Sequence, residues 1–120
     1  MSIPNEALQK LLQEIESRVI TSQQQIGITK AQMTSKNRDV RMLELTSKEI
    51  GSLPGETKVY EGVGKMFVGV PRSTVDKRIS TESGELKTDI DKLEKRMHYL
   101  EMTFKNSREN LEAILKSGKA

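Results

Sequence analysis

Hydrophobic residues in the first third of the chain recur at alternating spacings of three and four residues. One set of positions seven residues apart, here called the apolar column, consists of Leu12, Val19, Ile26, Met33 and Val40. A second set, the mixed column, is polar in its middle and consists of Leu8, Ile15, Ser22, Thr29, Lys36 and Leu43. Sustained heptads of this kind are typical of a coiled coil. We therefore expect a first coiled-coil helix over residues 5–44.

The last third of the chain repeats this pattern and predicts a second coiled-coil helix over residues 74–117. Its two heptad columns are Ile90, Met97, Phe104 and Leu111, and Ile79, Leu86, Leu93, Leu100, Ser107 and Ile114. The columns of the two helices extend over the same number of residues. The helices can therefore pair antiparallel within one chain, which would place Leu8 near Ile114 and Leu43 near Ile79.

Residues 45–73 connect the two helices and have a different composition. Thr46 followed three residues later by Glu49 is a capping-box pattern, which predicts a short helix over residues 47–53. The glycine-rich stretch that follows predicts a β-hairpin, with strands at 58–61 and 65–70 joined by a turn at 62–64. The hairpin residues that we expect to act in assembly are Val59, Tyr60, Gly62, Val63, Gly64, Met66, Phe67, Val68 and Val70.

The predicted hairpin carries apolar side chains on both of its faces. An isolated hairpin is marginally stable in water, and its open edges favour pairing with further strands. The rest of this chain offers no other strand-forming sequence, so we expect the additional strands to come from other chains. The fold expected for residues 1–120 is thus a single, mainly α domain of two long antiparallel coiled-coil helices, joined by a short helix and a β-hairpin.

Composition and charge narrow the possible functions. With 34% hydrophobic and 3% aromatic residues, a chain of 120 residues cannot build a large globular core. The net charge is +3, but basic and acidic residues alternate along the whole chain, which argues against binding of nucleic acid. We find no signal-peptide pattern and no apolar run approaching the roughly 20 residues that cross a bilayer. Together with the absence of cysteine, this favours a cytoplasmic protein without membrane contact.

Residues that could support catalysis or cofactor binding do not form a recognisable site. Gly64 and Lys65 are followed by Met66 rather than by the Ser or Thr of a phosphate-binding loop. His98 is the only histidine, and no metal-ligand spacing such as C-x-x-C or H-E-x-x-H occurs. We therefore expect no enzyme activity, no cofactor and no metal.

The order of helix, exposed hairpin and returning helix resembles the β-type subunits of the prefoldin family over essentially the whole chain. The stretch Tyr60-Glu61-Gly62-Val63-Gly64-Lys65-Met66-Phe67 looks like a signature of one eukaryotic branch of that family. The resemblance implies a heterohexamer of α-type and β-type subunits whose hairpins build an intersubunit β-barrel. It also implies ATP-independent capture of unfolded or nascent proteins, such as actin and tubulin, and their delivery to the cytosolic chaperonin.

A chaperone of this kind needs apolar surface for its clients, and we expect that surface where the two chain ends meet. The residues concerned are Ile3, Leu8, Leu11, Leu12, Leu111, Ile114 and Leu115. Leu11 and Leu115 lie outside the heptad columns, whereas the other residues can equally well close the end of the coiled coil. The alternative function is a structural coiled-coil adaptor that binds folded partners, and binding of unfolded protein would distinguish the two.

Overall fold

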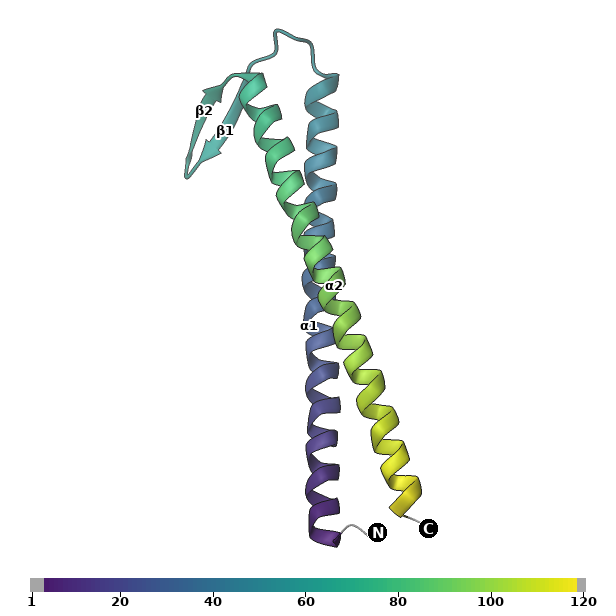
Figure 1. The fold of residues 1–120 in the computed structure, drawn as a ribbon. Helices are drawn as coiled ribbons and strands as arrows, with labels where there is room; N and C mark the ends of the chain where they lie inside the picture. Colours follow the sequence, from purple (N-terminus) through teal and green to yellow (C-terminus); the bar gives the residue numbers. More distant parts are fainter. Residues whose placement is uncertain (1–3, 119–120) are drawn as a thin grey trace. The chain divides into compact units, whose positions relative to one another are not determined.

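The computed structural model describes residues 4–118, which form two long helices and one two-stranded sheet (Figure 1). In chain order the elements are α1 (Asn5–Ser52), β1 (Val59–Val63), β2 (Met66–Val70) and α2 (Arg72–Gly118). They divide into two compact units, one of residues 1–33 with 92–120 and the other of residues 34–91. The predicted fold class of two long helices with a hairpin between them is confirmed.

The predicted short helix over 47–53 is wrong, because α1 continues without interruption to Ser52. The Thr46 hydroxyl does not cap a new helix but donates to the Met42 carbonyl one turn earlier, at 2.8 Å. No proline occurs between residues 44 and 52, so nothing stops the helix before Pro54. The first helix therefore covers 5–52 rather than 5–44.

Helix α2 begins two residues earlier than expected and ends one residue later, at 72–118 rather than 74–117. The Pro71 carbonyl accepts hydrogen bonds from the backbone N–H groups of Thr74 at 3.0 Å and Val75 at 3.3 Å. Pro71 therefore both ends the preceding strand and opens the helix, since it lacks the N–H that a continuing sheet would need.

The hairpin has a tighter turn than the sequence predicted. Strands β1 and β2 pair antiparallel from Val59 opposite Val70 to Val63 opposite Met66. This register leaves a two-residue turn of Gly64 and Lys65, and Gly64 has a φ of 61°. Lys65 does not have positive φ, and a two-residue hairpin turn with positive φ at its first position only is of type II′, which strongly favours glycine there. The expected three-residue link over 62–64 is thus wrong, because Gly62 and Val63 belong to β1.

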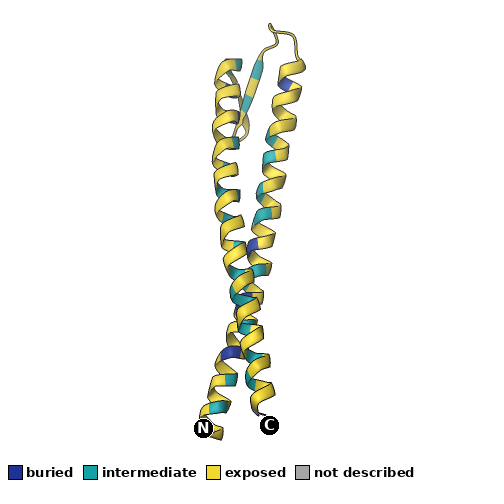
Figure 2. Cartoon of the chain, turned by 45° about the vertical axis from the view of Figure 1, so that its right-hand side comes forward, coloured by how far each residue is buried: buried dark blue, intermediate teal, exposed yellow. Residues whose placement is uncertain are grey.

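Buried residues are few and lie in narrow lines along the helices, as Figure 2 shows. In the unit of residues 34–91, Ile50, Val75 and Ile79 form a small core. In the other unit the buried side chains belong to Ile15, Ser22 and Thr29 of α1. The heptad pattern of the sequence accounts for this arrangement, since each helix buries one narrow stripe.

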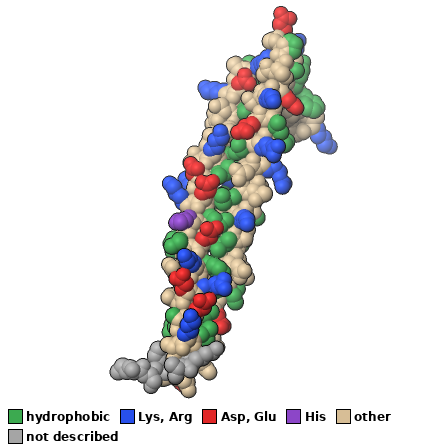
Figure 3. Space-filling view, turned by 90° about the vertical axis from the view of Figure 1, so that its right-hand side faces the viewer, with side chains coloured by type: hydrophobic (Ala, Val, Ile, Leu, Met, Phe, Trp, Pro, Cys, Tyr) green, Lys and Arg blue, Asp and Glu red, His purple; other side chains and the backbone are tan. Residues whose placement is uncertain are grey.

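The remaining surface is strongly charged. Acidic and basic side chains alternate along the face shown in Figure 3, with apolar groups between them. Within residues 4–118, no helix is long and apolar enough to cross a membrane.

Candidate functional site

One face of the hairpin, which we call the inner face, packs against the helices of its own unit. The paired residues Val59 and Val70 contact the core of Ile50, Val75 and Ile79. Leu43 of α1 packs against the same core. The base of the hairpin is therefore anchored by apolar burial, the main stabilising term available to a chain with so small a core.

An ion pair continues this attachment beyond the apolar contacts. Glu61 lies on the inner face, and its Oε1 atom is 2.5 Å from a guanidinium nitrogen of Arg78 on α2. Oε1 is shielded from water and receives no hydrogen bond of suitable angle, so the Arg78 cation is what offsets its charge. Arg78 also lies 3.6 Å from Glu82, one turn further along α2. The pair fixes the middle of β1 relative to α2.

A second arginine joins the end of α1 to the start of α2. The Arg72 guanidinium donates to the backbone carbonyl of Leu53 at 3.3 Å and to that of Ile50. The last carbonyls of a helix have no partner within the helix, and a cation is favourable beside them. Arg72 thus caps α1 from a position 19 to 22 residues away in the sequence.

The opposite face of the hairpin, the outer face, carries two exposed aromatic rings. Tyr60 is directly opposite Gly69, and Phe67 is directly opposite Gly62. A Cβ atom built on Gly69 would lie 3.5 Å from the Tyr60 ring, and one built on Gly62 would lie 3.8 Å from the Phe67 ring. Each ring therefore lies against the backbone of the glycine across the sheet, an arrangement that pins strand register. Even so, Tyr60 is 57% and Phe67 80% exposed.

The hairpin leaves several large apolar side chains exposed. Towards its turn, Val63, Met66 and Val68 are exposed on the inner face, Met66 to 68%. An apolar groove also runs from the end of α1 to the outer face, and its lining residues are Ile50, Leu53, Lys58, Val59, Tyr60 and Phe67. Within the described residues the sheet has two strands, so both of its edges are open to pairing. Contiguous apolar patches of this kind mark interaction sites.

The predicted client-binding residues belong to the other unit. Leu8, Leu12, Leu111 and Ile114 are half-buried, as expected of heptad positions. Leu11 and Leu115 are exposed, as their places outside the columns predicted. Ile3 lies outside the described residues. The client-binding role of these residues stays a prediction.

Among residues 4–118, no three His, Cys, Asp or Glu side chains gather closely enough to hold a metal ion. The sequence interpretation missed Arg72 and Arg78 as positioning residues. Arg72 directly follows Pro71 at the start of a helix, which signals a cation near the junction, but its carbonyl partners depend on how the chain folds.

The sequence of this helix–hairpin–helix chain matches a known protein family over nearly its whole length. A protein-family model described as "Prefoldin subunit" matches residues 7–118. The chain belongs to the prefoldin family. The predicted resemblance is confirmed, and the chain is a co-chaperone subunit of a family whose subunits form complexes with one another.

Two relatives of known family agree with this assignment. The chain is 31% identical to prefoldin subunit 1 of Mus musculus over 113 residues, which cover 94% of this chain and 93% of the relative. It is also 31% identical to the probable prefoldin subunit 1 of Schizosaccharomyces pombe over 110 residues, covering 92% of this chain and 98% of the relative. Among solved structures, the prefoldin beta subunit from Thermococcus strain KS-1 matches with 28% identity and a TM-score of 0.47, over 97% of this chain and 91% of the other.

Proposed function

We propose that the chain is one β-type subunit of a heterohexamer of α-type and β-type prefoldin subunits. In this assembly its hairpin adds two strands to an intersubunit β-barrel. The observation that carries the proposal is a two-stranded sheet with open edges and exposed apolar side chains on both faces. Pairing with strands of neighbouring subunits would satisfy the backbone groups at those edges and remove the rings of Tyr60 and Phe67 from water.

The proposed activity of the assembled complex is ATP-independent capture of unfolded or nascent polypeptides in the cytoplasm. We infer actin and tubulin as clients and the cytosolic chaperonin as the recipient, from the family to which the chain belongs. Exposed Leu11 and Leu115 at the end of the unit that contains both termini support this role. Unfolded chains expose apolar segments, and apolar surface that stays available in the folded complex can hold them. The proposal includes no catalytic step.

Co-expression with the other subunits, followed by native mass spectrometry, tests the assembly. We expect the tagged chain to purify in a complex of six subunits. Phe67→Asp should prevent that complex from forming, because assembly would bury a charge among apolar strands. Tyr99→Asp is a matched control, since Tyr99 is an exposed aromatic residue of α2 outside the hairpin.

Each result has a defined meaning. Normal assembly of the Phe67→Asp chain would show that the hairpin is not the joint between subunits. If the unsubstituted chain itself forms no six-subunit complex, the structural adaptor that binds folded partners becomes the better account. Loss of assembly in both variants would mean that added surface charge, rather than the position of Phe67, disrupts the complex.

A further inference from the structure

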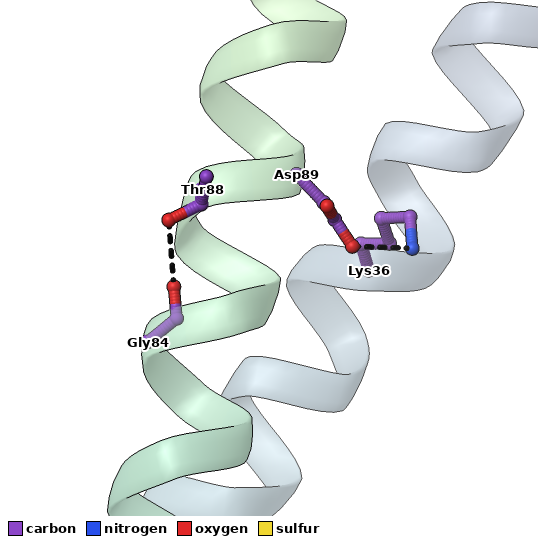
Figure 4. Close-up of polar contacts among 4 residues, drawn as sticks. All are labelled: Lys36, Gly84, Thr88 and Asp89. Carbon is purple, nitrogen blue, oxygen red and sulfur yellow. Dashed lines mark hydrogen bonds and ion pairs between the residues drawn. The ribbon is translucent and has the colours of Figure 1, made fainter.

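The mixed column of α1 places polar groups where a coiled coil normally buries leucine. Thr29 is only 1% exposed, and Ser22 is also buried. One heptad beyond Thr29, the Lys36 ammonium group reaches Asp89 of α2, with Nζ and Oδ2 3.4 Å apart (Figure 4). The neighbouring Thr88 hydroxyl instead donates to the Gly84 carbonyl of its own helix. The partner of Lys36 on α2 is therefore the Asp89 carboxylate. Polar side chains thus interrupt the apolar stripe of α1 at three successive heptads.

The heptad column of α2 is apolar at Leu86, Leu93 and Leu100, so the polar partner of Lys36, Asp89, lies outside that column. In the unit that holds both termini, Arg96 donates to Gln25 at 3.3 Å, which sets the antiparallel register of the two helices. Counting from this contact brings Thr29 to within one residue of Leu93, and Ser22 to within one residue of Leu100. The small polar residues of α1 thus lie near the level of large apolar residues of α2 rather than of other small ones.

Stability alone does not explain a lysine in this column. The side chains of Lys36 and Asp89 remain 35% and 48% exposed, and ion pairs as exposed as this add little to stability. A leucine at the same position would bury apolar surface instead. A charged residue in a heptad column is better known for selecting partners and register, at some cost in stability.

The geometry of parallel coiled coils indicates which partner a lysine in this column disfavours. When two identical helices pair in parallel, the same column positions face each other. Two copies of α1 would then bring their Lys36 ammonium groups together and set Ser22 and Thr29 against their own copies. We propose that Lys36 prevents α1 from pairing with the α1 of a second copy and so directs it to α2 of its own chain. This inference concerns the fold and holds independently of client capture.

The chain has no cysteine, so a single introduced cysteine reports contact between copies without ambiguity. Met33→Cys in the apolar column would face its own copy in a parallel α1 pair, within reach of a disulfide. We would place this change in the full-length chain, with Lys36 retained or replaced by leucine, and measure disulfide-linked dimer after mild oxidation. We expect Lys36→Leu to raise the dimer yield by about tenfold, because it removes the like-charge contact that opposes parallel pairing.

Two further variants distinguish the effect of the Lys36 charge from non-specific hydrophobic association. Lys48→Leu adds the same leucine to an exposed position of α1 outside the columns, and should leave the dimer yield unchanged. The exchanged pair Lys36→Asp with Asp89→Lys keeps a like charge in parallel α1 pairs and should also give no increase. An unchanged yield with Lys36→Leu would overturn the proposal. Equal increases in the Lys36→Leu chain and in either of the other two would overturn it as well.

Discussion

Gly64 is the residue whose backbone conformation closes the hairpin. Its φ of 61° costs an L-residue roughly 1–2 kcal/mol, whereas glycine adopts it freely. We therefore expect Gly64→Ala to increase amide hydrogen exchange in β1 and β2 by about tenfold, the equivalent of roughly 1.4 kcal/mol of opening free energy. Gly62→Ala is the control, because its φ is not positive and its new Cβ would meet the Phe67 ring at an ordinary 3.8 Å. Equal effects of the two variants would contradict the assignment of the turn.

The ion pair of Glu61 and Arg78 allows a test of how the hairpin is held. Glu61→Lys would place two cations together on the inner face, so we expect it to release the hairpin and weaken assembly with partner subunits. Arg78→Glu combined with Glu61→Lys should restore assembly in large part, because the opposite charges meet again. Arg78 is more than half exposed, so the coupling in a double-mutant cycle should stay within about 1 kcal/mol. A double variant no better than Glu61→Lys alone would mean that the carboxylate acts in some other way.

At the scale of single residues, the sequence predicted which residues form the hairpin. It did not predict the charged contacts that hold the hairpin and the helix ends together. Alternating apolar residues and the glycines of 59–70 identify the strands directly. The partners of Arg72 and Arg78 are backbone carbonyls and a carboxylate from elements distant in sequence. Charge pairs of that kind follow from the packing of β1 and α2, which heptads and turn signals do not specify.

Each long helix contains an interior glycine that weakens it without serving a contact. A Cβ added to Gly27 of α1 or to Gly84 of α2 would meet nothing within 4 Å. We expect Gly27→Ala and Gly84→Ala each to raise the free energy of unfolding by roughly 0.5–1 kcal/mol, since alanine is the better helix former. Urea denaturation followed by circular dichroism would measure this. A loss of stability in either variant would contradict the expectation that alanine fits the helix at that position.

The boundary of α1 was mispredicted because the same residues fit two different helix patterns. Thr46 and Glu49 fit a capping box, but the same residues also fit a helix interior, where a threonine hydroxyl can bond the carbonyl four residues earlier. Which outcome occurs depends on whether the chain already runs as a helix through Leu43 and Leu45. Heptads predicted the existence and pairing of α1 and α2 well, whereas local end signals placed their boundaries poorly.

For the whole molecule, the open question is which exposed apolar side chains meet clients. The sequence singled out Leu11 and Leu115 because they lie outside the heptad columns, and both are exposed. Exposure alone does not single them out, since Ile20 and Met102 of the same unit are exposed as well. The sequence pattern thus identified Leu11 and Leu115 as candidates. The exposure of the described residues identified Ile20 and Met102 as controls on the same helices.

Client capture can therefore be tested with two double variants that each replace two exposed apolar side chains by serine. Leu11→Ser with Leu115→Ser removes apolar surface near the helix ends, whereas Ile20→Ser with Met102→Ser removes it further along the same helices. Because all four side chains are exposed, neither variant should disturb the coiled coil or the six-subunit complex. We expect the first variant to lose several-fold in suppressing the aggregation of chemically unfolded actin, and the second to match the unsubstituted complex. If both lose capture alike, clients bind along the helices rather than at their ends, and if neither does, capture depends on surfaces of the other subunits.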